Sequence, residues 1–563
     1  MRVALFAVVS VVGLIFSFRP LVLDSVIKSV RSRTPGVFNR FPNLSFYKTA
    51  PFSSFQHSLD PFISNAAPHS FCEIADPEAY RQIVIDADQD ILEFMFQQLM
   101  NIVRRPCLGH FVKRIEYLHQ TEDGAYSKLA HQRDLSADDM RLLKRAVANA
   151  GFKDGNEEDV MSMLMQASFS KDVNHRADGW CSFGNWDNSR TYITQLLTAL
   201  FVSLAPNLET IAMTQPFQYH IELEEGETPV LAYPLVQVLK YANSRPEGIH
   251  FLQKLREVYL INIPPSYSDS RFYSHATDLI ACLELFNKLP LIESIGIDVF
   301  EPNEDHGKFT GESKSSNITK IHINHSSLSS DYLLLVMETS KIITELQYTT
   351  GGRATNDGSH PVFNPKAFIK GLSAHRHTLK VLDIDTDTLT STYPGELRAG
   401  GSYLVDWDKW GGPDQFDPDD YDAEDLNEDN FEFQSHQYLV SIWDRNVSLK
   451  DFVTLQELSI GIRFLIYFAQ GVETDDAKRS SVMLVDSLPD SLESLTIRGY
   501  QKGVNQEHDA QVAALMTRFE SGSMRLKEIQ GVEELIPNGE DVENPDEDEH
   551  LLWSLIELGY SEY

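Results

Sequence analysis

Residues 488–497, with the sequence LPDSLESLTI, carry the pattern that decides the fold of this chain. Three apolar residues, Leu492, Leu495 and Ile497, are separated first by two polar residues and then by one. Side chains of a β-strand point alternately to its two faces, so Leu495 and Ile497 share one face and Thr496 lies on the other. The segment therefore predicts a short strand with one buried and one solvent-facing side.

The same spacing of apolar residues recurs along the chain, and such recurrence is the signature of repeat architectures. From Val258 onward, most central residues of consecutive units are about 25 to 37 residues apart, which fits one strand and a return through a helix or loop. The units are Tyr80/Ile83/Ile85, Val112/Ile115/Tyr117, Leu208/Ile211/Met213, Leu255/Val258/Leu260, Ile292/Ile295/Ile297, Ile318/Ile321/Ile323, Ile343/Leu346/Tyr348, Leu379/Leu382/Ile384, Leu455/Leu458/Ile460, Leu492/Leu495/Ile497 and Leu526/Ile529/Gly531.

The positions between the apolar residues are mostly polar from Leu208 onward, as in Arg256 and Glu257. A buried row of Leu and Ile beside a row of solvent-exposed polar residues is typical of the parallel sheet of a solenoid. We therefore predict an α/β solenoid with a parallel row of strands, helices or loops on its outer face, and a short helical region before it. An ordinary α/β domain with unrelated short strands is the alternative.

The residue between the second and third apolar positions of each unit defines a predicted outward row. From the third unit onward this position holds Ala212, Tyr259, Gly296, His322, Gln347, Asp383, Ser459 and Thr496. We expect Tyr259, His322, Gln347 and Asp383 to lie close together on one face and to bind a partner protein. Aromatic residues are favoured contacts because they combine a large area with a polar group.

The composition argues against nucleic acid as a partner. The chain has 82 acidic and 48 basic residues, a formal net charge of −34, and such a surface repels phosphate backbones and anionic lipid head groups. Residues 413–433 are interpreted as an acidic, disordered insertion and residues 538–563 as an acidic, solvated C-terminal tail. Both stretches would also suit basic partners.

Residues 1–18 form a hydrophobic leader, interpreted either as a signal or anchor sequence or as the product of a wrongly assigned gene start. Membrane contact is expected only through residues 3–18, and an uncleaved leader would leave the body of the protein cytosolic. We expect a cytoplasmic or nuclear protein, with the secretory pathway or membrane anchoring as the alternative. The four cysteines, Cys72, Cys107, Cys181 and Cys282, are expected to be reduced and mostly buried.

Several segments resemble fungal F-box and leucine-rich-repeat proteins of the substrate-adaptor type, and the resemblance extends from about Pro68 to Trp553. They are 71–80 (FCEIADPEAY), 448–460 (SLKDFVTLQELSI), 488–497 (LPDSLESLTI) and 526–529 (LKEI). The resemblance implies an irregular leucine-rich-repeat domain at 71–537. In that family the F-box binds a Skp1-type adaptor, and the repeats present a substrate to a cullin-based ubiquitin ligase. Residues 19–70 lack the leucine-proline opening of an F-box and are interpreted as a poorly ordered or degenerate F-box-like lead-in.

Catalytic motifs are missing from the sequence: it contains no GxxxxGK[ST] loop, HExxH helix or GxSxG elbow. A metal site from His322 and His325 with His375 and His377 is disfavoured because no carboxylate or cysteine cluster joins them. We expect no enzymatic activity, cofactor or metal. The predicted function is a protein-interaction scaffold, including a substrate receptor of an SCF-type ubiquitin ligase. The alternative is a secreted or membrane-anchored protein with an unassigned activity such as hydrolysis, which would need a deep cleft with converging titratable groups.

Overall fold

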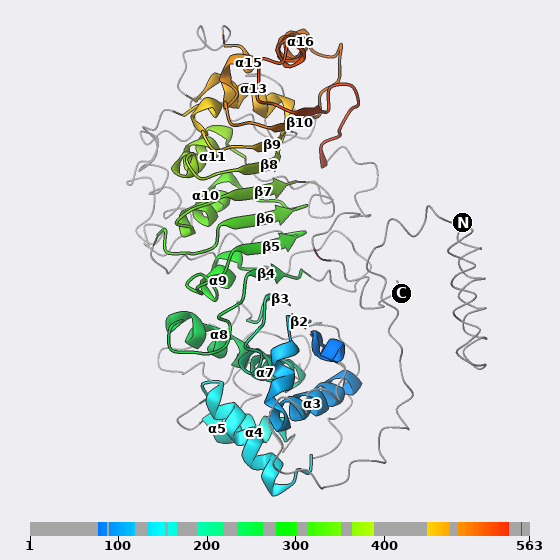
Figure 1. Ribbon diagram of the computed structural model, residues 1–563, viewed down its shortest axis with the longest axis vertical. Coiled ribbons are helices and arrows are strands. Elements are labelled where there is room, and N and C mark those ends of the chain that lie inside the picture. Colours follow the sequence, from blue (N-terminus) through cyan, green and yellow to red (C-terminus); the bar gives the residue numbers. More distant parts are fainter. Residues whose placement is uncertain are drawn as a thin grey trace, which may run out of the picture. The chain divides into compact units, whose positions relative to one another are not determined.

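Figure 1 shows the computed structural model of the chain, which divides into two units, Met1–Ala67 and Pro68–Tyr563. The leader at 1–18, the lead-in at 19–70, the short helical region expected before the strands and the acidic insertion at 413–433 lie outside the described residues. The structure describes residues 77–86, 89–118, 133–152, 156–165, 189–217, 233–262, 277–300, 313–350, 363–387, 447–472, 482–539 and 553.

A single parallel sheet runs through the second unit, and its eleven strands are hydrogen-bonded in chain order (Figure 1). This arrangement confirms the predicted α/β class with one row of parallel strands. The strands are β1 (Gln82–Ile85), β2 (Arg114–Tyr117), β3 (Thr210–Met213), β4 (Glu257–Leu260), β5 (Ser294–Asp298), β6 (Lys320–Asn324), β7 (Glu345–Thr349), β8 (Val381–Asp385), β9 (Glu457–Gly461), β10 (Ser494–Arg498) and β11 (Glu528–Gln530).

The register of the sheet follows the repeated sequence pattern. Each of the eleven units supplies one strand, and the central apolar residues of neighbouring units face each other from Ile83 on β1 to Ile529 on β11. Backbone hydrogen bonds also join the residues just before the strands: the N–H of Arg256 donates to the carbonyl of Glu209, and Glu293 donates to Arg256, both at 2.8 Å. The repeat spacing therefore fixes which side chains are neighbours across the whole sheet.

Helices pack against the apolar side of the sheet, where they form one continuous core with the inward-facing strand residues (Figure 1). The α-helices are α3 (Gln89–Arg104), α4 (Ala137–Asn149), α5 (Asn156–Leu164), α7 (Ser189–Leu204), α8 (Pro234–Ser244), α9 (Leu279–Glu284), α10 (Ser330–Thr339), α11 (Pro365–Leu372), α13 (Ile462–Gln470), α15 (Leu484–Ser487) and α16 (Gln506–Glu520). Short 3-10 turns are η4 (Pro77–Tyr80), η5 (Pro106–Phe111), η8 (Ser373–His375) and η11 (Leu449–Asp451).

Local sequence explains where several of these helices begin. A side-chain oxygen of Ser136, Asp278, Ser329 or Asn364 accepts a backbone N–H three residues later, at the starts of α4, α9, α10 and α11. Such caps satisfy backbone donors that have no partner within the helix. Residues in the segments that connect the strands therefore determine where these helices begin, independently of the strand pattern.

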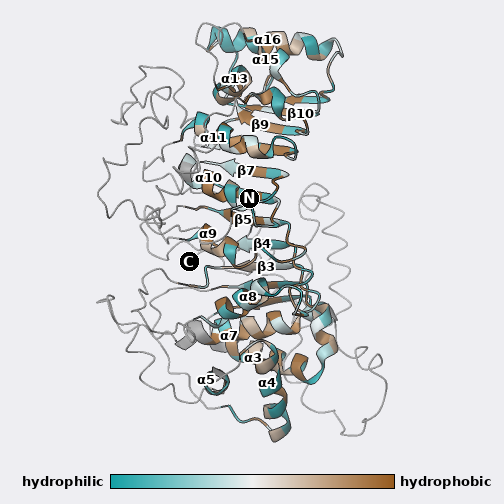
Figure 2. Ribbon diagram, turned by 90° about the vertical axis from the view of Figure 1, so that its left-hand side faces the viewer, coloured by the Kyte–Doolittle hydropathy of each residue, from teal (hydrophilic) through white to brown (hydrophobic). Residues whose placement is uncertain are grey.

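Apolar and polar residues alternate along the strands, as Figure 2 shows by hydropathy. The inward positions after the central residue are also nearly inaccessible to solvent. They are Ile85, Tyr117, Met213, Leu260, Ile297, Ile323, Tyr348, Ile384, Ile460 and Ile497. The two inward rows and the helices behind them account for most of the apolar area that folding removes from water, which is the main favourable term in folding.

Gly531 replaces the third apolar residue of the last unit for a steric reason. Its φ of +81° is rarely adopted by residues with a side chain, and a Cβ there would lie 1.8 Å from the carbonyl oxygen of Ile497. Glycine allows the chain to turn away after β11 at this close approach.

The cysteines differ from the expectation of four reduced thiols. Cys107, in η5, is disulfide-bonded, and its partner lies outside the described residues. Cys282, on α9, is a buried free thiol whose pKa is raised well above its ordinary value, first by burial and then by the negative charge of Asp278. The sparse cysteine spacing could not reveal a long-range pair, because residues far apart in sequence become neighbours only in the fold.

Within the described ranges, no helix is both long and apolar enough to cross a bilayer.

The disulfide predicts a stepwise pattern of alkylation. In denaturant without reductant, iodoacetamide should modify Cys282 and leave Cys107 unmodified, because unfolding exposes a thiol but does not break a disulfide. After reduction both residues should be modified, as measured by peptide mass spectrometry. Modification of Cys107 before reduction would contradict the bond.

The register predicts opposite sensitivities for two adjacent residues on β7. Leu346→Ala should lower the free energy of unfolding by about 2–5 kcal/mol, because it opens a cavity in the core. Gln347→Ala, on the opposite face, should change it by about 0.5 kcal/mol or less. Urea denaturation measures both values, and equal losses would mean that the two faces are wrongly assigned.

Candidate functional site

The sheet has a second face, directed away from the helices, and the predicted contact residues lie on it. Consecutive strands place Tyr259 beside Gly296, Gly296 beside His322, His322 beside Gln347, and Gln347 beside Asp383. Neighbouring strands lie about 4.8 Å apart. The register thus brings the four predicted residues into one row across β4 to β8, interrupted only by Gly296 on β5.

Tyr259 differs from the expectation of a solvent-exposed contact residue. It is only 8% exposed, because the indole of Trp553 stacks on its ring with a centroid separation of 5.2 Å and an interplanar angle of 17°. Trp553 belongs to the segment predicted as a solvated tail, yet it is itself 9% exposed. The alternation of side chains along the strand correctly placed Tyr259 on the outward face. It could not reveal that a residue distant in sequence covers the ring.

The indole of Trp553 lies between side chains from β2 and β4. The guanidinium carbon of Arg114, on β2, is 3.7 Å from the indole centroid, on the ring face. Between these strands β3 contributes Ala212, which is fully buried. Leu118 and Ile261 complete this apolar cluster, and Val84 packs against it. We call Arg114, Leu118, Ala212, Tyr259 and Ile261 the indole pocket.

Both polar groups at the edge of the indole pocket contact Asp298, at the end of β5. Tyr259 donates its hydroxyl to Asp298 Oδ2, and the backbone N–H of Trp553 donates to the same oxygen at 3.3 Å. Burial raises the pKa of the Tyr259 hydroxyl well above its ordinary value, and the charge of Asp298 raises it further. Beyond area burial, the ring stack contributes roughly 0.5–1.5 kcal/mol and the Arg114 contact roughly 0.5–2 kcal/mol.

The middle of the outward face carries partly exposed polar groups on β6 and β7. His322 Nε2 lies 2.9 Å from Glu345 Oε1, and Lys320 Nζ lies 3.9 Å from Glu345 Oε2. Gln347 is partly exposed beside them. Surface ion pairs such as Lys320–Glu345 stabilise a fold by roughly 0–1 kcal/mol. These side chains can therefore exchange their contacts for those of a partner at little cost to the fold.

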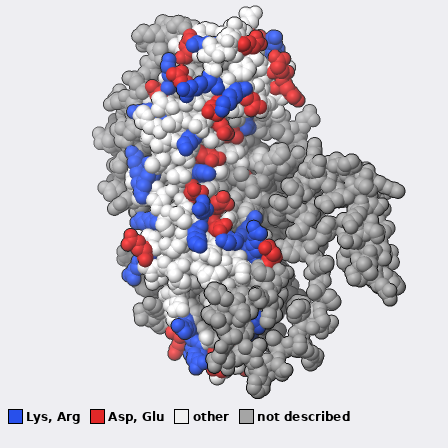
Figure 3. Space-filling model, viewed as in Figure 1, with Lys and Arg blue, Asp and Glu red and all other residues white. Residues whose placement is uncertain are grey.

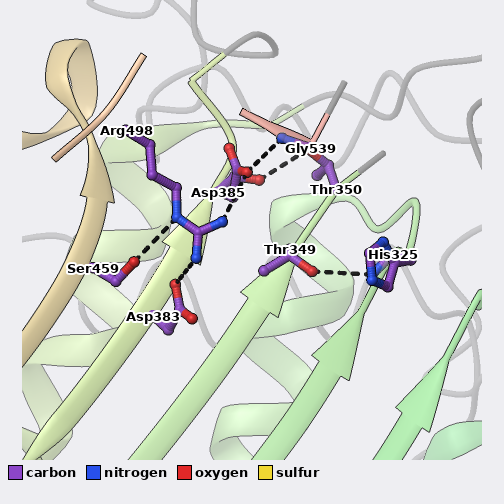
Figure 4. A network of polar contacts seen from close by, with 8 residues as sticks. All are labelled: His325, Thr349, Thr350, Asp383, Asp385, Ser459, Arg498 and Gly539. Atoms are coloured by element: carbon purple, nitrogen blue, oxygen red, sulfur yellow. Dashed lines mark hydrogen bonds and ion pairs between the residues drawn. The ribbon is translucent and has the colours of Figure 1, made fainter. Parts of the chain in front are cut away.

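A polar network occupies the other end of the row, around Arg498 on β10 (Figure 4). The side chain of Arg498 crosses β9, where its Nε donates a hydrogen bond to Ser459 Oγ at 3.0 Å. Its guanidinium then reaches two carboxylates on β8. Its Nη2 lies 2.8 Å from Asp383 Oδ1 and its Nη1 lies 3.2 Å from Asp385 Oδ2. Asp383, predicted as a partner contact, is thus held by an ion pair inside the domain.

The C-terminal segment contacts this network too. The backbone N–H of Gly539 donates to Asp385 Oδ2 at 2.7 Å, and Ile536 forms a β-bridge with Arg498. The fold therefore continues beyond residue 537, where the repeat domain was predicted to end, and Asn538 is buried. Figure 4 also shows Thr350 at this place, whose hydroxyl donates to the carbonyl of Asp385 at 2.9 Å.

Asp385 is completely buried, and burial raises its pKa to about 6. Arg498 and the N–H of Gly539 oppose this rise, whereas the charge of Asp387 adds to it. The pKa of Asp385 in the folded state exceeds the ordinary value of 3.8. Folding is therefore accompanied by uptake of a proton at pH values between 3.8 and about 6. The contribution of Asp385 to stability is therefore greatest at low pH and decreases as the pH rises toward about 6.

Charges of both signs are interspersed over the strands in the view of Figure 3, and no large patch of one sign is visible there. Across the described ranges, no group of three or more His, Cys, Asp and Glu side chains is arranged to hold a metal ion. The histidines considered as ligands have other contacts: His375 Nδ1 accepts the N–H of Ile343 at 3.2 Å, and His377 accepts from Arg376 at 3.2 Å.

Sequence reasoning missed Arg114, Asp298, Arg498 and Trp553. Alternation along the strands could have placed the first three on the outward face, since each is an even number of residues from an outward position. Trp553 offered only a weaker signal, a single large aromatic residue beside an acidic run.

Comparison with protein-family models gives no match, and comparison with curated proteins gives none either.

The Arg498 network predicts a pH-dependent loss of stability. Arg498→Gln removes the cation that favours ionised Asp385, so the pKa of Asp385 should rise further. The variant should be less stable than wild type by roughly 1–3 kcal/mol at pH 8 and by less at pH 5, where folded Asp385 is largely protonated. Urea denaturation at both pH values measures the difference. The matched comparison uses the Asp385→Asn background, where the effect of Arg498→Gln should lose most of its pH dependence. A difference that stays pH-dependent there would assign the effect to another group.

Proposed function

We propose that the chain is a non-enzymatic scaffold that binds another protein through the outward face of its parallel sheet. The observation that supports this most directly is the row of partly exposed polar side chains on β6 and β7. His322 and Gln347 stand there on strands whose other face is committed to the core. A rigid row of closely spaced side chains, each on a different strand, can contact the surface of a partner at several points.

The electrostatics favour a protein partner. The acidic balance of the whole chain opposes nucleic acid, and the mixed charges over the strands suit a protein surface that also carries both signs. Lys320 and Glu345 lie beside His322, so a partner can form charge-assisted hydrogen bonds of either polarity in the middle of the face.

The resemblance to fungal F-box and leucine-rich-repeat proteins extends this proposal to a substrate receptor of an SCF-type ubiquitin ligase. In this version the outward face holds the substrate, and the segment before the repeats contacts a Skp1-type adaptor and, through it, a cullin. Purification of the full chain and of residues 68–563 from cells tests it. Skp1 and cullin should accompany the full chain alone, and their absence from both preparations would contradict the ligase version.

Site-specific photo-crosslinking tests the binding face itself. A photoreactive phenylalanine analogue at Gln347 should yield a discrete crosslinked partner in native extracts, whereas the analogue at Lys240, exposed on α8, should not. His322→Ala should reduce the yield from Gln347, and the control Lys240→Ala should leave it unchanged. The same species from both positions, or none from Gln347, would overturn the proposed face.

A second candidate, a secreted or membrane-anchored protein, is favoured by one observation. Cys107 is disulfide-bonded, and such bonds persist mainly in oxidising compartments. Recovery of the native chain from a secretory fraction with Cys107 oxidised would support this candidate. Recovery from the cytosol with a reduced Cys107 would eliminate it.

A further inference from the structure

The indole pocket is a second apolar cluster, separate from the core, on a face that is otherwise largely polar. Arg114, Ala212 and Tyr259 stand at outward positions of the neighbouring strands β2, β3 and β4, and Leu118 and Ile261 directly follow β2 and β4. Outward positions in a sheet of this kind normally meet water, so an apolar group there needs a cover. In this structure the cover is the indole of Trp553.

The geometry of the pocket fits a flat aromatic ring. Ala212 provides a shallow floor, because its neighbours across the strands, Glu116 and Tyr259, are much larger. Tyr259 stacks on one side of the indole, and Arg114 lies over a ring face. Arg114 Nε is 3.0 Å from Oε1 of Glu116 on the same strand, and that oxygen also accepts a hydrogen bond from Gln82 on β1. Among aromatic side chains, tryptophan interacts most strongly with a cation over its face.

The pocket also recognises the backbone of its occupant. Asp298 Oδ2 accepts the N–H of Trp553 at 3.3 Å and the hydroxyl of Tyr259, so one carboxylate links the ring-binding wall to the bound backbone. An isolated hydrophobic contact would need no such acceptor. A ring slot with an adjacent backbone acceptor is the arrangement expected for a peptide-binding site.

We propose that the indole pocket is a recognition site for a tryptophan-bearing segment of a partner protein, and that Trp553 is its intramolecular occupant. This inference deepens the proposed function and rests on it, because the pocket lies on the same outward face. The C-terminal segment contacts that face at Asp385 through Gly539 and at Asp298 through Trp553. A partner tryptophan therefore competes with Trp553, whose attachment to the same chain gives it a high effective concentration.

A peptide of residues 546–563, labelled with fluorescein, provides the probe, and fluorescence anisotropy measures its binding to the full chain. The Trp553→Ala chain, with a vacated pocket, should bind the peptide at least about tenfold more tightly than the wild-type chain, which must first release its own indole. The same peptide carrying Trp553→Ala should bind the vacated chain at least about tenfold more weakly than the unaltered peptide. Equal binding by the two chains, or by the two peptides, would overturn the proposal.

A substitution that fills the pocket distinguishes specific binding of the peptide at this site from nonspecific hydrophobic binding. In the Trp553→Ala chain, Ala212→Leu should abolish peptide binding because leucine occupies the floor, whereas the matched outward substitution Thr496→Leu, on β10, should leave it unchanged. Thermal unfolding of both variants verifies that they are folded. Should Ala212→Leu fail to fold, Arg114→Gln replaces it and should weaken binding several-fold. Peptide binding that is insensitive to both pocket substitutions would overturn the assignment.

The outcomes for the pocket and for the scaffold function are distinguishable. A partner crosslinked from Gln347 without peptide binding would overturn the pocket alone. Peptide binding in trans without a partner at Gln347 would overturn the proposed function and, with it, the role of a partner tryptophan. It would leave the pocket as an attachment point for the chain's own C-terminal segment.

Discussion

The alignment of apolar residues between neighbouring parallel strands is the constraint on which the rest of this fold depends. From Ile83 to Ile529, the central residues of the repeats face each other across every strand pair. A shift of one residue in any pair would turn a whole inward set toward solvent and a polar set toward the core. The register is therefore strongly specified even though each strand has only three to five residues.

This constraint also creates the outward face. With one side of every strand committed to the core, the remaining side chains stand in rows whose order follows the chain. Individual repeats then differ in what they place there: an apolar group at β2 to β4, partly exposed polar groups at β6 and β7, and an ion-pair network at β8 to β10. The same architecture thus offers three different chemistries on one surface.

Two residues of the C-terminal segment contact that surface at separate places. Gly539 donates to a buried carboxylate on β8, and Trp553 donates to another at the end of β5. Each carboxylate is costly to bury unless it accepts hydrogen bonds, so Gly539 and Trp553 contribute to the stability of the face that they contact. The contacts of Gly539 and Trp553 and the stability of the domain are for this reason coupled.

The sequence by itself determined the strands, their order and the side to which each residue points. The spacing of Leu492, Leu495 and Ile497 was enough, because alternation along a strand and repetition along the chain are local properties. It correctly placed Tyr259, His322, Gln347 and Asp383 in one outward row. Their role as partner contacts stays a prediction.

Only the tertiary structure decided which of these positions are open. Trp553 covers Tyr259, and Arg498 neutralises Asp383 from two strands away. These contacts join residues separated by tens to hundreds of positions, and no local pattern encodes such pairings. They form because the completed sheet brings the charges and rings of distant segments within contact distance.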